Sequence, residues 1–367
     1  MKIVFFSNNV QNTEHFRLPL VKFLNKKKHK IYLITFDKKD RKIQSNFKKN
    51  FHNIYNINIP NINFFSLIKS IIIIYKLLKF INPNIILSYT LQANIVSSIL
   101  SKLTKFKFIL NITGLGSYFI SGNRYLKSIL KFTLKLSKYF IFQNKSDFNF
   151  FFDHDEINKK NISIIPSLGI KIIKIKKKLS KKKSTNFLMV SRIIRDKGII
   201  EYISASKFFK KNKKIKFYLA GDFDKSNPSR INKVKFKSLM KSSNVIYLGH
   251  KKNIQRFMSK YSCIVLPSYR EGLSRTLLES GAQGIPAITS NVPGCNDIIQ
   301  NKVNGLLCRP RSTESLIKSI NLFLKMDYIT KKKLSYKAYE IVLRKFNQDI
   351  VLKSYYKKIL NVSKYKI

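Results

Sequence analysis

Short apolar runs alternate with longer amphipathic stretches along this chain. The short runs have the length of buried strands, and the longer ones have the apolar spacing of helices. Strands and helices that alternate in this way pack as repeated strand-helix-strand units around a parallel sheet. In the first half the predicted strands are 2–6, 30–36, 84–89, 105–112, 139–143 and a short run ending at Pro166, and the predicted helices are 16–27, 64–81, 91–104 and 122–137.

A lysine-rich run, 171–186, interrupts the alternation. It has no apolar period after Ile175, which is typical of a solvated loop. The pattern then starts again and predicts a second α/β domain, for which a chain of 367 residues is long enough. There the predicted strands are 187–190, 214–221, 245–250, 263–268, 286–289 and 305–308, and the predicted helices are 198–211, 229–241, 252–260, 275–284, 312–325 and, in one or two pieces, 329–362.

The chain is strongly basic. Lys and Arg number 72 against 18 Asp and Glu, a formal net charge of +54. Such a charge is typical of nucleic-acid-binding proteins, but these lysines are scattered rather than gathered with Arg in one stripe. We therefore interpret the charge as a compositional bias and keep a nucleic-acid-binding protein as an alternative. The charge also predicts attraction to anionic lipid headgroups and phosphorylated substrates.

The most apolar window is 64–81. Lys69, Lys76 and Lys79 interrupt it, so it predicts an amphipathic helix rather than a membrane span. That helix either only covers the sheet or also touches a membrane surface. Because the N-terminal run MKIVFFSNNV is too short for a signal peptide, we expect a cytoplasmic protein, peripheral on the cytoplasmic face of the inner membrane.

Two cations follow the predicted strand 187–190. Arg192 and Lys197 stand at its carboxyl end, just before a helix predicted to begin near Gly198. The first turn of a helix offers free N–H groups and a positive dipole end, so the cations and the helix form a candidate anion site. Lys197 suits a terminal phosphate, and Arg192 can hold two oxygens at once. The alternative is two ordinary basic residues in a basic chain.

Two glutamates lie eight residues apart in PSYREGLSRTLLESGAQGIP. Glu271 is on the loop after strand 263–268, and Glu279 is in the early turns of the next helix. Carboxylates at that separation suit hydroxyls at two ends of a polar ligand, such as those of a ribose. The backbone N–H groups of 272–276 suit a diphosphate. The alternative is a salt-bridged helix, against which the neighbouring glycines and prolines and the scarcity of acids both count.

Asp222 and Asp224 form a D-x-D pair in YLAGDFDKSNP. Such a pair holds a divalent cation in some sugar-nucleotide enzymes, but acids after a strand commonly cap turns. We therefore predict no metal site and no cofactor. The three cysteines contain no CxxC pair and predict neither a disulfide framework nor a zinc site; they are Cys263, Cys295 and Cys308.

The E-x7-E spacing from Glu271 to Glu279, within PSYREGLSRTLLESGAQGIPAITSNVPGCNDII, resembles the signature of the family 4 retaining glycosyltransferases. SRIIRDKG resembles that family's basic pair, and NKVNGLLC resembles the turn and strand that follow. In the first half EHFRLPL (14–20), SYTLQAN (88–94) and NITGLGSYFI (111–120) resemble a subgroup that elongates lipid-linked oligosaccharides. The resemblance covers nearly the whole chain.

This resemblance implies the GT-B fold, in which two Rossmann-like, doubly wound α/β domains face a cleft and a last helix crosses back to the first domain. We expect an acceptor-binding domain at 1–167, a donor-binding domain at 168–345 and the crossover helix at 346–367. The implied activity is retaining transfer of a hexose or N-acetylhexosamine from a nucleotide-sugar, expected to be a UDP-sugar. The implied acceptor is a lipid-linked or surface glycan of polysaccharide, lipopolysaccharide or glycoprotein biosynthesis. The alternatives on the same fold are a sugar-nucleotide epimerase and a phosphorylase.

The resemblance also assigns residues. Arg192 and Lys197 would hold the donor diphosphate in place of a metal, and Glu271 would face the transferred sugar; these three are the expected catalytic residues. Glu279 would bind the ribose of the donor, and the nucleobase of the donor would lie near His250. The expected donor-binding residues are Arg192, Lys197, His250, Glu271, Gly272, Leu273, Ser274 and Glu279, and the expected acceptor-binding residues are His15, Arg17, Thr113, Gly114 and Gly116. The donor sugar and the acceptor stay open.

Overall fold

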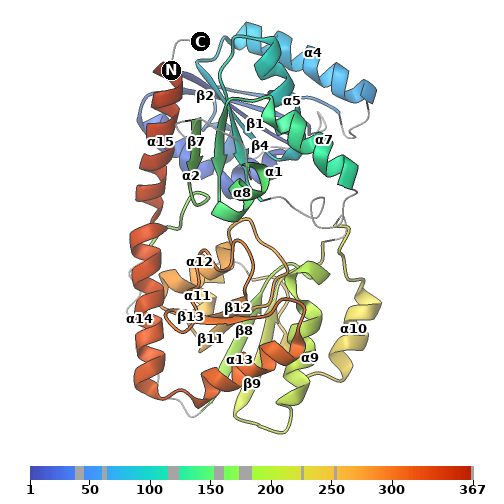
Figure 1. Cartoon of the computed structure of the whole chain (residues 1–367), viewed down its shortest axis with the longest axis vertical. Helices are drawn as coiled ribbons and strands as arrows, with labels where there is room; N and C mark the ends of the chain where they lie inside the picture. The colour runs from blue at the N-terminus through green and yellow to red at the C-terminus, as the bar shows by residue number, and fades with distance from the viewer. Residues whose placement is uncertain are drawn as a thin grey trace. The chain divides into compact units, whose positions relative to one another are not determined.

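The structure, a computed structural model, contains two α/β units, each built on one parallel sheet (Figure 1). Unit 1 comprises Met1–Leu168 and Asp349–Ile367, and unit 2 comprises Gly169–Gln348. The structure describes residues 1–37, 45–59, 64–114, 124–152, 161–172, 184–224, 227–251 and 254–364.

The sheet of unit 1 has the strand order β3-β2-β1-β4-β5-β6-β7, and its described pairs are parallel. The chain begins in the middle of the sheet, so the strand order reverses between β1 and β4. Its strands are β1 (Lys2–Ser7), β2 (Lys30–Thr35), β3 (Asn53–Asn56), β4 (Ile85–Tyr89), β5 (Phe108–Ile112), β6 (Tyr139–Phe142) and β7 (Ile162–Ile164). Its helices are α1 (Val10–Phe16), α2 (Leu18–Lys26), α3 (Ser45–Lys48), α4 (Phe64–Ile81), α5 (Leu91–Leu103), α7 (Arg124–Lys135), α8 (Lys145–Phe152) and the C-terminal α15 (Gln348–Lys364).

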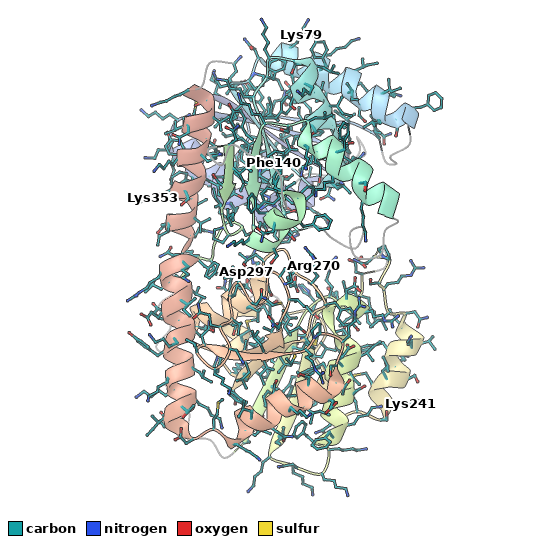
Figure 2. The ribbon with its side chains drawn as sticks, viewed as in Figure 1. Lys79, Phe140, Lys241, Arg270, Asp297 and Lys353 are labelled. Atoms are coloured by element: carbon teal, nitrogen blue, oxygen red, sulfur yellow. The ribbon has the colours of Figure 1, made fainter. Side chains whose placement is uncertain are left out.

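Both faces of this sheet are covered, because successive residues of each strand point to opposite sides. Ile3 and Phe5 of β1 enter a core that α2 and α15 close, whereas Val4 and Phe6 enter a core that α4 and α5 close. Phe140 of β6 lies in the second core, while the labelled lysines, Lys79 among them, extend outward (Figure 2). Within the described residues, no helix has both the length and the apolar content needed to cross a membrane.

The sheet of unit 2 has the order β10-β9-β8-β11-β12-β13, again with parallel pairs. Its order reverses between β8 and β11. Its strands are β8 (Thr185–Val190), β9 (Ile215–Ala220), β10 (Val245–Tyr247), β11 (Cys263–Leu266), β12 (Ala287–Ser290) and β13 (Gly305–Cys308). Its helices are the short 3-10 helix η2 (Arg195–Lys197), α9 (Ile199–Phe208), α10 (Lys233–Lys241), α11 (Ile254–Met258), α12 (Arg275–Ala282), α13 (Thr313–Lys325) and α14 (Tyr328–Lys345).

The predicted pair of parallel doubly wound sheets is confirmed, with some local corrections. The predicted helix 16–27 corresponds to α2, which begins only after Arg17 and has Pro19 in its first turn, where a missing N–H costs nothing; Phe16 instead ends the separate helix α1. The sequence pattern missed β3, α1, α3 and α8. Residues 122–123 and 252–253 of two predicted helices, and most of the lysine-rich run, lie outside the described residues.

Lys358 makes the stability of unit 1 depend on pH. Burial in α15 lowers the pKa of its ammonium from 10.5 to about 8. Because the folded-state pKa lies below the unfolded one, the charge destabilises the fold below about pH 8, and the penalty fades as the pH rises toward 10.5. We expect Lys358→Met to raise the free energy of unfolding by about 1–3 kcal/mol at neutral pH and by less near pH 10.

Urea unfolding of the wild type and the variant at the two pH values measures this difference. Lys357→Met removes an exposed neighbouring lysine and is the matched control. An equal gain at both pH values, or an equal gain in the control, would contradict the assignment.

Candidate functional site

The point where the strand order of unit 2 reverses is the natural place for a ligand. β8 and β11 are neighbours in the sheet and run parallel, so their carboxyl ends lie side by side. The chain leaves β8 toward α9 and leaves β11 toward α12. In open α/β sheets such a reversal opens a crevice beyond the strand ends, where ligands bind.

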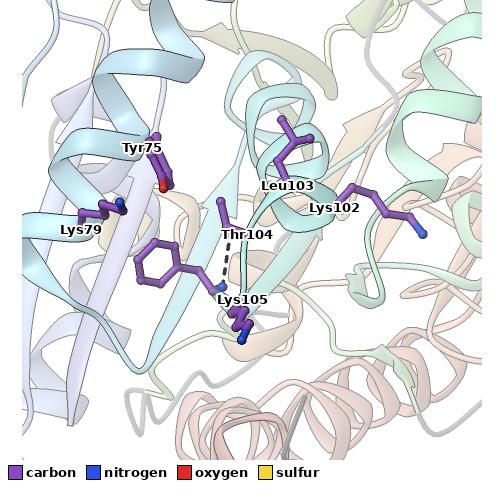
Figure 3. Close-up of a pocket in the computed structure, with 7 residues that line it drawn as sticks. Tyr75, Lys79, Lys102, Leu103, Thr104 and Lys105 are labelled. Carbon is purple, nitrogen blue, oxygen red and sulfur yellow. Dashed lines mark hydrogen bonds between the residues drawn. The ribbon is translucent and has the colours of Figure 1, made fainter.

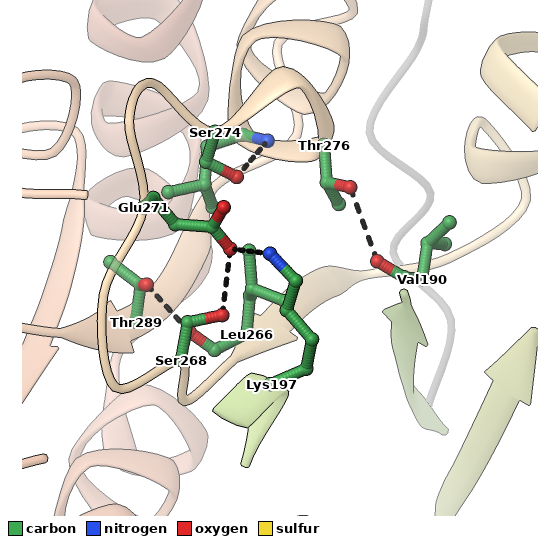
Figure 4. Close-up of polar contacts among 9 residues, drawn as sticks. Val190, Lys197, Leu266, Ser268, Glu271, Ser274, Thr276 and Thr289 are labelled. Atoms are coloured by element: carbon green, nitrogen blue, oxygen red, sulfur yellow. Dashed lines mark hydrogen bonds and ion pairs between the residues drawn. The ribbon is translucent and has the colours of Figure 1, made fainter. Parts of the chain in front are cut away.

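Lys197 and Glu271 meet at this point (Figure 4). The Lys197 Nζ lies 2.6 Å from Glu271 Oε1, and Ser268 Oγ donates to the same oxygen at 2.8 Å. The Lys197 side chain is 18 % exposed and the Glu271 side chain 12 %, so the ion pair is largely shielded from water. A shielded pair of this kind interacts more strongly than one on the surface.

A glycine makes this contact possible. Gly198, which joins η2 to α9, has φ +74°, and a Cβ at that position would lie 2.1 Å from the backbone oxygen of Pro267. Only glycine allows the loop after β8 to pack so closely against the end of β11. That close approach brings Lys197 next to Glu271.

A second glycine holds the loop that carries Glu271. The Glu271 N–H donates to Pro293 O at 3.1 Å, and the Ser274 N–H donates to Gly294 O at 3.0 Å. Gly294 has φ +77°, and its Cβ would lie 2.4 Å from the backbone oxygen of Glu271. The loop after β12 therefore fixes the backbone of the loop after β11.

We expect Gly294→Ala to disrupt this arrangement strongly. A methyl group would meet the Glu271 backbone, which cannot move without breaking both hydrogen bonds, so we expect a loss of about 2–4 kcal/mol in the free energy of unfolding. Gly249→Ala is the matched control, since Gly249 has φ +65° but open space around its Cβ position. The control is expected to lose about 1 kcal/mol from backbone strain alone. Equal losses in denaturant unfolding would show that the contact with Glu271 is unimportant.

Ser274 begins α12. Its Oγ accepts the Leu277 N–H at 3.4 Å, and its own N–H is bound to Gly294. Both polar groups therefore have partners within the chain. Thr276 Oγ1 donates to Val190 O at 3.1 Å and ties the start of α12 to the end of β8 (Figure 4).

Glu279 is buried within α12 and paired with Arg275, whose Nε lies 2.9 Å from Glu279 Oε1. The salt-bridged helix that the sequence reasoning disfavoured is therefore present at this residue. Glu271 lies outside the helix, which begins only at Arg275, so the chain between the two glutamates is part loop and part helix.

Arg192 and Lys197 have separate partners. Arg192 is 56 % exposed and its Nη1 lies 2.5 Å from Asp224 Oδ2, while His250 Nδ1 lies 3.0 Å from Asp222 Oδ2. The two aspartates of the D-x-D pair thus each face a basic side chain. In the part of the chain that the structure describes, no group of three or more His, Cys, Asp or Glu is placed to hold a metal ion.

Tyr269 anchors the loop after β11, a role that the sequence did not predict. Its hydroxyl donates to Glu201 Oε1 at 2.7 Å, and its N–H donates to Asp196 O at 2.8 Å. Burial, together with the Glu201 carboxylate, raises the pKa of Tyr269 to about 12, so the hydroxyl stays a donor at neutral pH. The contact links the loop after β11 to α9 and η2.

Cys295 is a buried thiol whose pKa is influenced by Glu271. Burial raises the pKa of its thiol well above the ordinary value, and the Glu271 carboxylate raises it further. The thiol is therefore neutral and unreactive at neutral pH. It packs as an apolar side chain rather than acting as a nucleophile.

The predicted acceptor residues of unit 1 fall into different environments. Arg17 is buried, with its guanidinium carbon 4.3 Å from the ring centroid of Tyr89 at the end of β4, whereas His15 is exposed in the last turn of α1. Thr113 and Gly114 follow β5 directly. Gly116 lies outside the described residues.

Two family models match the chain, one in each half. Residues 171–341 match the model described as glycosyl transferases group 1, and residues 2–144 match the model described as glycosyl transferase 4-like. Together the two matches include every expected donor-binding and acceptor-binding residue.

Curated relatives include enzymes that act on lipid-linked sugars. The chain is 28 % identical to the N,N'-diacetylbacillosaminyl-diphospho-undecaprenol alpha-1,3-N-acetylgalactosaminyltransferase of Campylobacter jejuni, over 97 % of this chain and 98 % of that protein. It is 25 % identical to the UDP-Gal:alpha-D-GlcNAc-diphosphoundecaprenol alpha-1,3-galactosyltransferase of Escherichia coli, over 71 % of each.

Solved structures share the fold over the full length. A glycosyltransferase from Rickettsia africae has a TM-score of 0.77 at 18 % identity and covers 100 % of this chain and 99 % of its own. HepE of Anabaena, solved in complex with UDP and glucose, has a TM-score of 0.75 at 15 % identity and covers 98 % of this chain and 100 % of its own.

Proposed function

We propose that this chain, a glycosyltransferase by the family models that match its two halves and by its GT-B fold, moves a hexose or N-acetylhexosamine from a UDP-sugar to a sugar carried on a polyprenyl diphosphate. The names of the Campylobacter jejuni and Escherichia coli relatives support a lipid-linked acceptor. The UDP in the name of the second relative and in the HepE complex supports the nucleotide.

The contact between Lys197 and Glu271 is the observation that carries the proposal. It joins a cation from the loop after β8 to a carboxylate from the loop after β11, at the point where the sheet order reverses. A nucleotide-sugar needs a cation for its diphosphate and a hydrogen-bond acceptor for the hydroxyls of its sugar. This pair supplies both within one contact.

We assign the roles accordingly. Lys197 holds the diphosphate, and Arg192 joins it by exchanging Asp224 for phosphate oxygens. Glu271 accepts hydrogen bonds from the transferred sugar, and Glu279 binds the ribose. The backbones of Gly272 and Leu273 line the path between phosphate and sugar.

In the proposed reaction the departing phosphate helps to deprotonate the acceptor on the face that it leaves, and the sugar is transferred with retention. The bond between the anomeric carbon and the β-phosphate oxygen breaks, and the acceptor oxygen bonds the anomeric carbon on the same face. The acceptor proton passes to the departing phosphate oxygen, and UDP leaves. Lys197 and Arg192 stabilise the negative charge that grows on the diphosphate, so the protein contributes position and electrostatics.

The acceptor is a membrane lipid in this proposal. Unit 1 binds its sugar and diphosphate through His15, Arg17, Thr113, Gly114 and Gly116. An acceptor of this kind places the enzyme on the cytoplasmic face of the inner membrane, held peripherally. The basic charge of the chain favours such contact with an anionic surface.

A donor screen tests the proposal. The chain is incubated with UDP- and GDP-sugars and a polyprenyl-diphosphate sugar in detergent, and nucleotide release and product mass are followed. We expect one UDP-sugar to be consumed and the acceptor to gain one sugar. No consumption of any UDP-sugar, or product formed equally with Glu271→Ala, would overturn the proposal.

We also expect transfer to persist in EDTA. The side chains of Lys197 and Arg192 supply the positive charge beside the diphosphate, and Asp222 and Asp224 are paired with His250 and Arg192. Initial rates with EDTA should stay within about twofold of the untreated rate, well below the effect of losing one charge-stabilising group. Strong inhibition that added Mg²⁺ or Mn²⁺ reverses would instead assign a cation to the two aspartates.

A further inference from the structure

The outer face of α4 is apolar where solvent would favour polar side chains. Ile74 and Leu78 of this helix are buried in the core of unit 1. On the opposite side Ile68 and Ile72 are exposed, and Phe80 is 79 % exposed. A surface helix ordinarily keeps its apolar residues on one stripe, so a second apolar face indicates a binding surface.

The same face is basic. Lys69, Lys76 and Lys79 are exposed on it, and Phe64–Ile81 contains no Asp or Glu. The end of α5 packs beside α4 and continues the pattern, with Leu103 70 % exposed among exposed lysines. We call this surface the α4–α5 face.

A hollow lies on this face (Figure 3). Its volume is about 470 Å³, and its lining includes Tyr75 and Lys79 of α4, Lys102 in the last turn of α5 and Lys105 just after that helix. The Lys79 ammonium lies 5.0 Å from the ring centroid of Tyr75. A lining that combines three lysines with Tyr75, Phe106 and Leu103 matches a phosphate group attached to an apolar chain.

We propose that the α4–α5 face docks on an anionic lipid bilayer, with Ile72, Phe80 and Leu103 entering the interface and the hollow receiving a phospholipid headgroup. This proposal rests on the proposed function, which already includes contact with a membrane, and it names the surface that makes this contact. A helix whose apolar face lies in the interface while lysines meet anionic headgroups binds in this way without spanning the membrane.

A second copy of the chain fits this face poorly. Residues 91–107 contain no Asp or Glu, and neither does α4. Two copies related by symmetry would therefore bring lysines against lysines with no carboxylate between them. An anionic bilayer neutralises the same lysines.

Vesicle flotation tests the apolar contribution. The full chain, without donor or acceptor, is mixed with phosphatidylcholine vesicles or with vesicles that also contain phosphatidylglycerol. We expect Phe80→Ser to weaken binding to the mixed vesicles about tenfold or more, since a buried phenylalanine contributes strongly to partitioning. Phe208→Ser is the matched control, because Phe208 is 64 % exposed on α9 of unit 2 and should leave binding unchanged.

A charge-matched pair of triple variants tests the hollow against the general charge of the chain. Both variants lose three exposed lysines, so a non-specific attraction would fall equally in both. We expect only the variant in the hollow to lose its preference for phosphatidylglycerol. The hollow variant is Lys79→Gln with Lys102→Gln and Lys105→Gln, and the control is Lys210→Gln with Lys211→Gln and Lys213→Gln.

The outcomes separate this inference from the proposed function. Variants that leave the mixed vesicles while their matched controls stay bound support the inference, whether or not the donor screen succeeds. Equal binding by each variant and its control overturns it. Dimerisation of the wild type by light scattering that Phe80→Ser abolishes would assign the face to a second copy and overturn it as well.

Discussion

Glu271→Gln is expected to lower kcat by about 10²–10³-fold while UDP binds as tightly as before or more tightly. The substitution keeps the size and the hydrogen-bonding shape of the side chain but removes its charge. In the free protein the carboxylate occupies Lys197, so a donor diphosphate competes with it for the ammonium. Removing the carboxylate charge frees Lys197 for the phosphate, yet it weakens the hold on the sugar that moves.

Steady-state kinetics with the UDP-sugar and calorimetry with UDP measure the two effects separately. Glu314→Gln is the matched control, since Glu314 pairs with Lys318 on the exposed side of α13 and should leave both quantities unchanged. Equal losses in kcat and in UDP affinity would mean that Glu271 only holds the loop together. An unchanged kcat would remove Glu271 from the reaction.

Lys197→Met is expected to lower kcat/KM by about 10²–10³-fold. The ammonium is the shielded cation of the site, and in the proposed mechanism its loss removes both the contact with the diphosphate and the stabilisation of the leaving group. It also leaves Glu271 without its cation in a largely buried position, which adds to the effect. Lys207→Met, which removes an exposed lysine of α9, should keep the wild-type value.

The double variant Lys197→Met with Glu271→Gln shows whether the two residues act as a pair. If they do, its kcat/KM is close to that of the more damaged single variant, because each substitution already removes the same contact. Losses that multiply would show that the two side chains act independently.

The sequence could predict the architecture because that information is local. Every predicted strand of unit 1 and unit 2 is a short apolar run between helices, so its position can be read without knowing its neighbours in space. β3 escaped because NIYN has only two apolar residues and lies at the sheet edge. Helix α1 escaped because it lies in the polar run after Asn9, which caps it.

The pairing within the site could not be predicted in the same way. From the sequence, Arg192 belongs with Lys197 and Glu271 with Glu279, because each pair lies on one loop or helix. In the structure Lys197 contacts Glu271, a residue 74 positions away, because β8 and β11 are adjacent in the sheet. Strand order is a property of the folded sheet, so only the fold shows which loops meet.

At Gly294 the sequence predicts the turn but not what the turn contacts. The Pro-Gly step in NVPGCND predicts a turn, but nothing in the sequence shows that the turn packs against the Glu271 backbone. That close approach appears only when the loops after β11 and β12 are placed side by side.

Calorimetric titration of UDP tests the central claim most directly, namely that the crevice at the ends of β8 and β11 holds a nucleotide-sugar diphosphate. The account predicts that the wild type binds UDP and that Arg192→Met with Lys197→Met weakens binding about 100-fold or more, since two charge-assisted contacts are lost. The charge-matched variant Lys210→Gln with Lys211→Gln should bind as the wild type does. Equal UDP affinity in both double variants, or no binding by the wild type, would contradict it.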